Sequence, residues 1–356
     1  MVISRVEPSI LSLRMRLLGG GNRYLKSWPE FTGGKMTVIE THNLTKMYGE
    51  LCAVHDLNLS INNEIYGLLG PNGSGKTTTM HMLTTLLVPT SGSATVSGYD
   101  ILKDAAKVRE RMSYVPQDMA VDIRLTGREN VTFFAKLYGI HDKRDRNRRV
   151  DEALSVMNLT DRADDSTRTY SGGMRRRLEL AQALVHEPDI LFLDEPTIGL
   201  DVAARKSIWE HIMNLRKSGM TILVTTHHMD EADRYCDRVG IIKGGSVITE
   251  GTPHELKSDL MKDVIVVRAE SGLPCTLPLG VTFVGEDEGE FMFAAEHGSK
   301  TLPMLLRFFD QHGIRVHSSL VREPTLEDVF LQSIGTESAD TCAFDYRQFR
   351  NMMWRR

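Results

Sequence analysis

A glycine-rich segment holds the residues whose types and spacing most clearly predict chemistry. In "GLLGPNGSGKTTTMHML" (Gly67–Leu83), the residues Gly70, Gly75, Lys76 and Thr77 fit the pattern G-x-x-x-x-G-K-[ST]. Glycines in such a turn let backbone N–H groups point inward around an anion, and a following helix adds the positive end of its dipole. An ordinary turn between a strand and a helix is the alternative. The segment indicates a nucleotide site and leaves the task of the protein open.

The side chains of this loop have distinct predicted tasks. Lys76 would reach the β- and γ-phosphates of a nucleotide, and the Thr77 hydroxyl would bind Mg²⁺. The residues predicted to contact ATP in this segment are Gly70, Pro71, Asn72, Gly73, Ser74, Gly75, Lys76, Thr77 and Thr78.

A second element with chemical potential is "ILFLDEP", an apolar run that ends in Asp194 and Glu195. In a parallel sheet these carboxylates would lie at the edge where the phosphate loop also emerges. Asp194 suits Mg²⁺ coordination, usually through water, and Glu195 would orient or deprotonate the attacking water. Two solvated residues at a strand end are the alternative, which loses force beside a loop that carries Lys76.

A third element is the turn at the start of "YSGGMRRRLELAQAL" (Tyr170–Leu184). Ser171, Gly172 and Gly173 sit at a helix start there, which is a second anion-binding turn. One nucleotide site has little use for two phosphate-binding helix starts far apart in sequence. Two copies of the chain have such a use, if each turn closes on the ATP of the other copy.

From about Val38 to Thr252 the sequence closely resembles the ATP-binding cassette (ABC) proteins. The resemblance implies that Tyr48 in "KMYG" stacks on adenine, and that Gln117 in "YVPQD" links the metal site to a transmembrane partner. It also implies a dimer contact for Asp201 in "IGLD" and a γ-phosphate contact for His227 in "VTTH". On its own such a histidine would more often be a core residue.

The resemblance completes the set of predicted site residues. Catalytic roles fall to Lys76, Gln117, Glu195 and His227. The Mg²⁺ ligands are Thr77, Gln117 and Asp194. The residues that reach the ATP of the other copy are Ser171, Gly172, Gly173 and Asp201.

Two positions depart from the commonest signature of these proteins, which has Leu and Gln where this chain has Tyr170 and Met174. The form "YSGGMRRRL", with the later "EPTLEDVFL" (Glu323–Leu331), resembles the daunorubicin-resistance and nodulation-type exporter ATPases. Met174 cannot donate an amide hydrogen bond across a dimer, so a contact from this position to the nucleotide sugar loses its donor. The phosphate contacts of Ser171 and Gly173 are unaffected.

The elements that would position these residues alternate between strands and helices. Strands are predicted at "VIETHNLTKMYG", "CAVHDLNLSI", "IYGLL", "SATVSGYDI", "DILFLDEP" and "MTILVTTH". Helices are predicted from the phosphate loop to about Leu87, across much of 127–158 and over Val202–Lys217. This alternation predicts a mostly parallel sheet with helices on both faces.

Near Pro253 the pattern changes to a small α+β arrangement, with strands at "VIVVRAE", "VTFVG", "EFMFAA" and "IRVHSS" and a helix over Leu302–His312. The predicted fold class is α/β, a P-loop NTPase of the ABC ATPase type with a mostly parallel core sheet, an antiparallel β subdomain and a helical subdomain. The predicted division is a disordered leader or misassigned start at 1–35, an ATP-binding domain at 36–252 with its helical subdomain at about 127–165, a C-terminal domain at 253–335 and a tail at 336–356.

Composition excludes several other classes. The 356 residues are 41% hydrophobic with a net charge of -4, so no global basic field favours nucleic acid. The four cysteines are far apart and form no C-x-x-C pair, which favours reduced thiols over a zinc site. No segment has the roughly 20 predominantly apolar residues of a membrane helix. The basic run "HDKRDRNRRV" (His141–Val150) has acidic neighbours and helical spacing, which favours a solvated helix face.

These observations and the resemblance predict the cytoplasmic ATPase subunit of an exporter. Two copies would enclose two Mg-ATP and drive a separate integral-membrane permease, which would hold the subunit on the inner face of the cell membrane. The permease would dock on the helical region from Gly127 to about Asp165, with Gln117 at its hinge. The alternative function is a soluble cassette ATPase that acts on nucleic acid or ribosomes, without transport.

Overall fold

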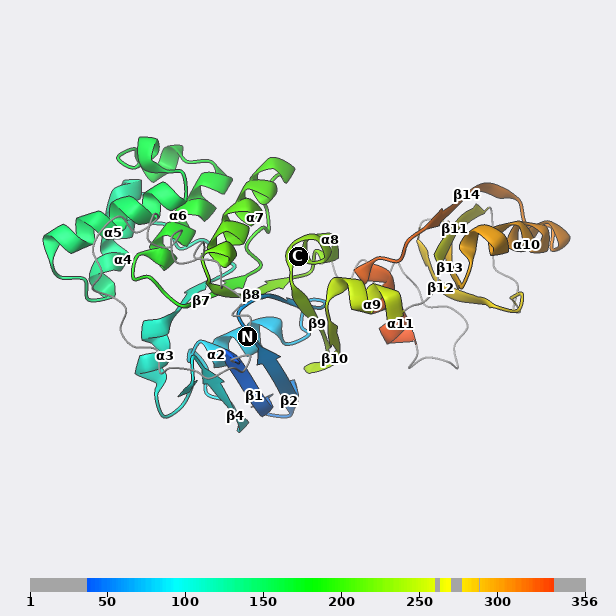
Figure 1. The fold of residues 1–356 in the computed structure, drawn as a ribbon, viewed down its shortest axis with the longest axis horizontal. Helices are drawn as coiled ribbons and strands as arrows, with labels where there is room; N and C mark the ends of the chain where they lie inside the picture. Colours follow the sequence, from blue (N-terminus) through cyan, green and yellow to red (C-terminus); the bar gives the residue numbers. More distant parts are fainter. Residues whose placement is uncertain (1–36, 260–262, 270–276, 288, 336–356) are drawn as a thin grey trace, which may run out of the picture. The chain divides into compact units, whose positions relative to one another are not determined.

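The computed structural model describes residues 37–259, 263–269, 277–287 and 289–335 (Figure 1). The predicted leader (1–35) and tail (336–356) lie outside the described residues. The chain forms two compact units. The first contains the described part of Met1–Tyr66 together with Thr77–Thr225, and the second contains Gly67–Lys76 and the described part of Thr226–Arg356.

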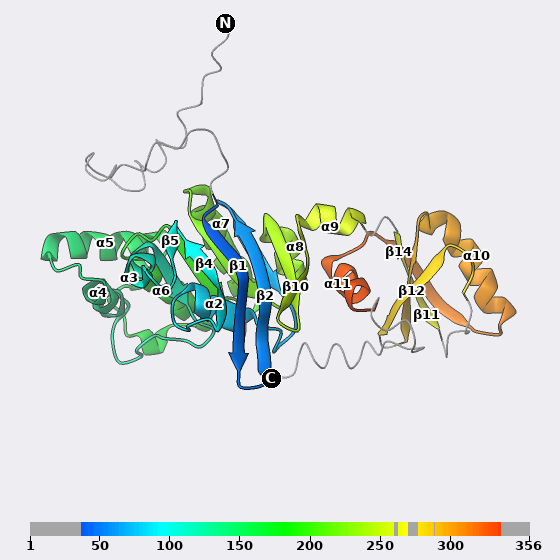
Figure 2. The same cartoon turned by 90° about the horizontal axis from the view of Figure 1, so that it is seen from below.

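The first unit contains an antiparallel sheet in the order β2-β1-β4-β5. Its strands are β1 (Ile39–Tyr48), β2 (Leu51–Ile61), β4 (Ser91–Val96) and β5 (Tyr99–Asp100). Figure 2 shows the long β1 and β2 side by side. In their antiparallel pairing Ile39 is opposite Ile61. The antiparallel β subdomain is confirmed. The single strand predicted at "SATVSGYDI" is wrong, because Ser97 and Gly98 adopt left-handed φ values of 51° and 77° and turn the chain between β4 and β5.

A parallel arrangement follows in the same unit. Its strands β6 (Met112–Val115), β7 (Ile190–Asp194) and β8 (Thr221–Thr226) pair in parallel in that order. The strand β3 (Ile65–Leu69) begins beside β8, where Ile222 N donates to Glu64 O at 3.0 Å. Every residue of β7 and β8 is buried, as expected for parallel strands covered on both faces, and every residue of β3 is buried as well.

The helices of the first unit are α2 (Lys76–Leu83), which begins at the unit boundary, α3 (Ala105–Arg111), α4 (Gly127–Leu137), α5 (Lys143–Val156), α6 (Gly172–Leu184) and α7 (Val202–Lys217). Two short 3₁₀ turns, η1 (Thr160–Arg162) and η2 (Thr167–Thr169), precede α6. Figure 1 shows α4 and α5 close together, within the region of about 127–165 where a helical subdomain is predicted, and α6 beside them but outside those bounds. The predicted extension of α2 to Leu87 is wrong: the Thr84 hydroxyl bonds Met80 O, and Thr85 is left-handed at φ 62°. On α5, Arg148 pairs with Asp145 and Glu152, which confirms that the basic run is a charged helix face.

The second unit begins with the end of β3 and the phosphate loop. After them come α8 (Met229–Tyr235), the antiparallel pair β9 (Arg238–Lys243) and β10 (Ser246–Gly251), and α9 (Pro253–Asp259). The β9–β10 hairpin is not among the elements predicted from the sequence, and its turn uses left-handed Gly244 and Gly245.

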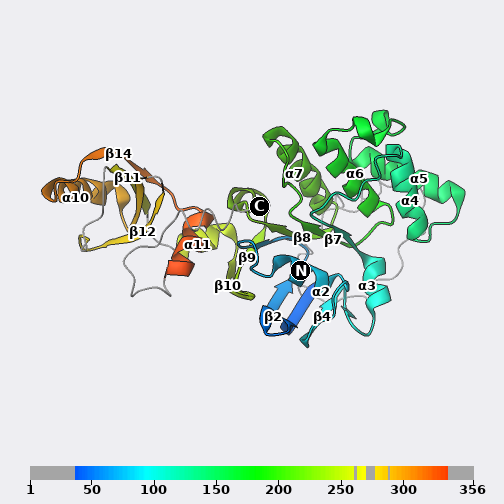
Figure 3. The same cartoon turned by 180° about the vertical axis from the view of Figure 1, so that it is seen from behind.

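The C-terminal part of the second unit is the predicted small α+β domain. Its sheet has the order β12-β13-β11-β14, made of β11 (Asp263–Ala269), β12 (Val281–Asp287), β13 (Glu290–Ala295) and β14 (Val316–Arg322). The helix α10 (Gly298–Gln311) lies along this sheet (Figure 3), and α11 (Leu326–Gly335) follows. Phe293 and Phe309 are fully buried between the sheet and α10, with ring centroids 5.8 Å apart.

Candidate functional site

The phosphate loop runs from the end of β3 to the start of α2, and two of its glycines have backbone conformations that favour glycine. Gly73 and Gly75 have φ values of 79° and 106°, a region that glycine adopts without strain. At Gly70 a Cβ atom would lie 2.3 Å from Ile242 O and 2.7 Å from the Ser74 hydroxyl. Only a residue without a side chain therefore fits at position 70 between the loop and β9.

The loop closes around its own lysine. Lys76 is 5% exposed, and its ammonium donates to Gly70 O at 2.7 Å and Pro71 O at 3.1 Å. The Ser74 carbonyl accepts a hydrogen bond from Gly245 N at 3.0 Å, which attaches the loop to the β9–β10 turn. The buried Ser74 hydroxyl has no hydrogen-bond partner among the described residues. A lysine and a buried hydroxyl are thus gathered in a loop whose Asn72 and Gly73 are exposed.

In the first unit, Asp194 ends β7 as a buried carboxylate with two hydrogen-bond donors. The Thr225 hydroxyl donates to its Oδ1 at 2.5 Å, and the Tyr114 hydroxyl donates to its Oδ2 at 3.3 Å. Burial and then the negative charge of Asp194 raise the pKa of Tyr114, so this phenol stays protonated as a donor. His81 Nε2 lies 3.2 Å from the Tyr114 hydroxyl, on helix α2. The carboxylate keeps lone pairs for a further donor or a cation.

Glu195, directly after Asp194, has a backbone conformation that glutamate rarely adopts. Its φ is 46°, and its N–H donates to Thr225 O at 3.1 Å and to the Thr225 hydroxyl at 3.0 Å. Residues held in this region cost on the order of 1–3 kcal/mol and persist where neighbours fix them. Strand β8 therefore holds the Glu195 backbone in a strained and defined conformation.

The turn Ser171–Gly173, called the signature turn below, lies at the exposed N-terminus of α6. The Ser171 hydroxyl caps α6 by accepting from Met174 N at 3.2 Å, and Ser171 and Gly172 are exposed. Tyr170 is 3% exposed, and its hydroxyl donates to Arg162 O at 2.5 Å. The structure explains why a tyrosine fits at position 170: its hydroxyl occupies the space that is left because Gly127 has no side chain.

The remaining predicted residues fall in both units. In the first unit Tyr48 is 49% exposed and carries the Lys46 ammonium 5.3 Å from its ring centroid. Gln117 is exposed just after β6, and Asp201 caps α7 by accepting from Ala204 N at 2.8 Å. In the second unit His227 follows β8, with its ring centroid 4.2 Å from that of His228.

Three residues around the carboxylates were not predicted from the sequence. Tyr114 and Thr225 bond Asp194, and Arg176 bonds the backbone around both carboxylates. Tyr114 and Thr225 lie inside apolar strands, where the pattern of residue types gives them no distinction. Arg176 lies in the run Arg175–Arg177, where residue type alone does not distinguish it from its neighbours. In the structure its side chain and that of Glu179, three residues later on α6, are both only 3% exposed.

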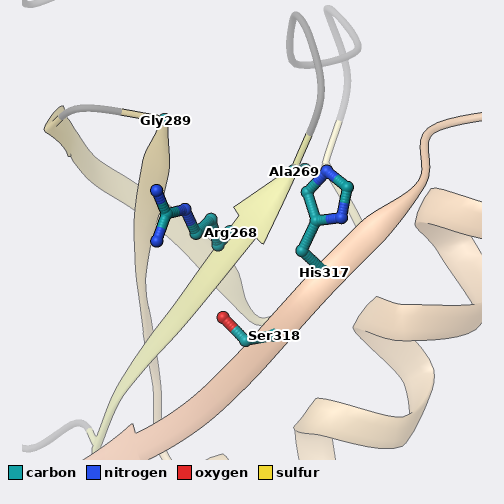
Figure 4. A pocket seen from close by; sticks show the side chains of 5 residues that line it. All are labelled: Arg268, Ala269, Gly289, His317 and Ser318. Carbon is teal, nitrogen blue, oxygen red and sulfur yellow. The ribbon is translucent and has the colours of Figure 1, made fainter.

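The C-terminal domain has a separate hollow of about 570 Å³ (Figure 4). It is lined by Arg268, Ala269, Gly289, His317 and Ser318. Arg268 and Ser318 are paired across β11 and β14 and share one face of the sheet. None of the predicted site residues lines this hollow. Arg268, His317 and Ser318 are exposed, so the hollow lacks the buried polar groups of a built site.

Among the residues that the structure describes, no helix combines the length and the apolar character needed to cross a bilayer. The described residues also contain no cluster of three or more His, Cys, Asp or Glu side chains that could hold a metal.

Two family models match the chain. Residues 54–198 match the model described as "ABC transporter", and residues 251–334 match "ATP-binding protein DrrA1-3-like, C-terminal domain". The first match contains the phosphate loop, the signature turn and the carboxylate pair. The second covers all four strands of the C-terminal sheet, α10 and all but the last residue of α11.

Relatives and solved structures agree with these matches. The chain is 37% identical over 312 residues to the linearmycin resistance ATP-binding protein LnrL of Bacillus subtilis (strain 168), covering 85% of this chain and 100% of that protein. It is 39% identical over 307 residues to the daunorubicin resistance ATP-binding protein DrrA3 of Streptomyces coeruleorubidus, covering 85% and 97%.

A solved structure with the same fold is the dimeric post-hydrolysis state of the ATP-binding cassette MJ0796 bound to ADP and Pi. Its TM-score is 0.54 at 29% identity, over 60% of this chain and 98% of that one. The fold, the phosphate loop and the matched sequences thus confirm the predicted resemblance. The chain belongs to the ABC transporter family, as an ATP-hydrolysing exporter subunit with a DrrA-like C-terminal domain.

Proposed function

We propose that the predicted site residues act on one Mg-ATP, with binding and hydrolysis assigned to different groups. Lys76 and the loop from Gly70 to Thr78 bind the phosphates, and Tyr48 stacks on the adenine. Glu195 acts on the attacking water, and His227 contacts the γ-phosphate. The observation that carries this proposal is the position of Glu195, whose backbone β8 holds at φ 46° directly after the buried Asp194.

The donor chemistry fits Mg²⁺ as the metal. Thr77, Gln117 and Asp194 would hold it, and all three offer oxygen, which this hard cation prefers. Mg²⁺ usually keeps several waters and is bound through one or two carboxylates and the substrate phosphates. A site without a cluster of metal-binding side chains among the described residues suits that mode. When bound, the cation would neutralise charge on the phosphates.

Lys76 supplies a positive charge that is already placed in the loop. Its ammonium rests on Gly70 O and Pro71 O, two neutral acceptors that an anionic phosphate can replace. Charge-assisted hydrogen bonds are roughly twice as strong as neutral ones. Binding of the nucleotide phosphates therefore favours transfer of the lysine from the loop carbonyls to the ligand.

The working unit in this proposal is a pair of chains. Ser171 and Gly172 are exposed at the start of α6, so their donors are available to the ATP of a second copy, together with Gly173 and Asp201. The dimeric MJ0796 cassette bound to ADP and Pi supports this arrangement by analogy. Closure of the pair on ATP and its reopening after hydrolysis would drive an integral-membrane permease.

The names of the relatives favour export of a hydrophobic drug or a related compound, because they are linearmycin and daunorubicin resistance proteins. The permease would dock on the helical subdomain and hold the subunit on the cytoplasmic face of the membrane. The non-transport alternative, action on nucleic acid or ribosomes, is not favoured by these relatives.

Two substitutions in the full-length chain separate binding from hydrolysis. Glu195→Gln keeps the shape and the binding groups and removes the base, so hydrolysis falls by roughly 10²–10⁴-fold while fluorescent ATP still binds. Lys76→Ala weakens ATP binding itself. Wild-type hydrolysis by Glu195→Gln would overturn the assignment of the base. Unchanged ATP affinity in Lys76→Ala would overturn the role of the loop lysine.

A further inference from the structure

We infer that Arg176 and Glu179 form a buried clamp that fixes the loop carrying Gln117 relative to the backbone of Glu195. Both are positioning residues, since neither is assigned to ATP or water. The inference rests on the proposed roles of Gln117 and Glu195. It assigns a task to the second arginine of the run Arg175–Arg177, which the proposed chemistry does not use.

Every N–H group of the Arg176 guanidinium donates a hydrogen bond, to the loop that carries Gln117, to the backbone around Glu195 or to Glu179. Its Nε donates to Pro196 O at 2.8 Å, and its Nη2 donates to Glu195 O at 3.1 Å and Asp194 O at 3.4 Å. Its Nη1 donates to Pro116 O at 2.8 Å and to Glu179 Oε2 at 2.8 Å. Five N–H groups thus meet five acceptors, three of which are consecutive carbonyls around Glu195.

Glu179 extends the clamp to the far side of the loop that carries Gln117. Its Oε1 accepts from Ala120 N at 2.5 Å, while its Oε2 holds Arg176. The loop is therefore anchored on both sides of Gln117, at Pro116 by the arginine and at Ala120 by the glutamate. One ion pair on α6 thereby joins the loop, the signature helix and the carboxylate segment.

Stability alone does not account for this arrangement. Both side chains are 3% exposed, and a buried ion pair of this kind often contributes little net stability compared with apolar residues of similar volume. Lysine has three donors and no planar fork, so it could not replace Arg176 at five acceptors. The fork geometry matters where several backbone oxygens must keep fixed mutual positions.

The neighbouring arginines show what anchoring without this role looks like. Arg177 donates to Met157 O and Asn158 O, at the end of α5, and Arg175 donates to Thr167 O and Arg168 O. Neither touches the segments around Gln117 or Glu195 in these bonds. Arg177 is therefore a matched control on the same helix.

The test uses the full-length chain with the double substitution Arg176→Met and Glu179→Leu. Removing both charges together avoids an unpaired buried ion, so the chain should fold. We expect an affinity for fluorescent ATP within about threefold of wild type and a kcat at least tenfold lower, a barrier increase of about 1.4 kcal/mol. Hydrogen exchange should rise in peptides spanning 116–122, and Arg177→Met should show neither effect.

Arg176→Lys provides a second test that keeps the charge. It should lower kcat by a smaller factor and speed exchange over 116–122, with KM for ATP little changed. A kcat of the double variant equal to that of Arg177→Met would overturn the inference. Loss of folding or of ATP binding in both Arg176 variants would also overturn it, because the pair would then be general structural support.

Glu195→Gln, measured in parallel, separates this inference from the proposed function. If Glu195→Gln is inactive and the double variant is fully active, only the clamp is wrong. If Glu195→Gln hydrolyses ATP like wild type, the assigned base is wrong, and the clamp loses the group that it is meant to position.

Discussion

Thr225 connects the two carboxylates of the site through one hydroxyl, and its replacement by valine tests that connection. The side chain is fully buried, and its Oγ1 donates to Asp194 Oδ1 while accepting from Glu195 N. Valine has nearly the same shape, so Thr225→Val leaves no cavity and removes only these two bonds. The Glu195 amide keeps a bond to Thr225 O at 3.1 Å, so the carboxylate of Asp194 suffers the principal loss.

The expected magnitude follows from the type of bond that is lost. A hydrogen bond to a charged group contributes on the order of 1.5–3 kcal/mol, against about 0.5–1.5 kcal/mol for a neutral one. We therefore expect Thr225→Val to lower the free energy of unfolding by about 2 kcal/mol. The kcat for ATP should fall by about tenfold, because the strained Glu195 backbone loses one of the two acceptors that hold it.

The neighbouring residue supplies the control. Thr226 is also buried, and its hydroxyl accepts one neutral bond from His228 N at 2.9 Å. Thr226→Val should cost about 1 kcal/mol or less. Urea unfolding and steady-state hydrolysis measure both variants. If Thr225→Val is no less stable than Thr226→Val, the bond to the Asp194 carboxylate contributes no more than a neutral hydrogen bond, which contradicts the prediction.

Three further perturbations follow from the structure. Burial lowers the pKa of His186 from 6.5 to about 4, so the free energy of unfolding should fall as the pH drops from about 6.5 to about 4 and then level off. When the free energy of unfolding is measured across this pH range, His186→Gln should show a weaker dependence on pH. Gly70→Ala should weaken ATP binding at least tenfold in fluorescence titrations, because its Cβ would clash with Ile242 O, and wild-type affinity would contradict this. Thr126→Ala removes the capping box that Thr126 forms with Glu129 on α4, and should lower the unfolding free energy by about 1 kcal/mol; an unchanged urea midpoint would contradict this.

The parts of the site that the sequence predicted are those in which residue type and local spacing determine the outcome. The phosphate loop needs glycine where φ is positive, and Gly73 and Gly75 take such values. Val202–Lys217 forms the predicted helix because its start is capped by Asp201 and its apolar residues repeat at helical spacing. The roles of the predicted residues in ATP chemistry stay predictions, which the substitutions above test.

The parts of the site that could not be predicted from the sequence depend on contacts between residues far apart in the chain. Arg176 reaches Pro116 and Glu195, which lie 60 and 19 residues away in the chain, and no local pattern encodes such bonds. Thr225 is one more β-branched residue in a buried strand until its hydroxyl is seen on Asp194. Isolated left-handed positions were missed too: Thr85, at φ 62°, lies just after the end of α2 at Leu83, where the sequence predicted that the helix continues.

The central claim is that two chains close on ATP through the signature turn, and the oligomeric state of Glu195→Gln tests it most directly. Light scattering would be recorded on this variant with and without saturating Mg-ATP. The same measurement would be made on a chain that carries both Glu195→Gln and Ser171→Arg. The account predicts an ATP-dependent dimer that Ser171→Arg abolishes, because the bulky cation would occupy the γ-phosphate seat. A Glu195→Gln chain that stays monomeric at saturating Mg-ATP, and that Ser171→Arg leaves unchanged, would contradict it.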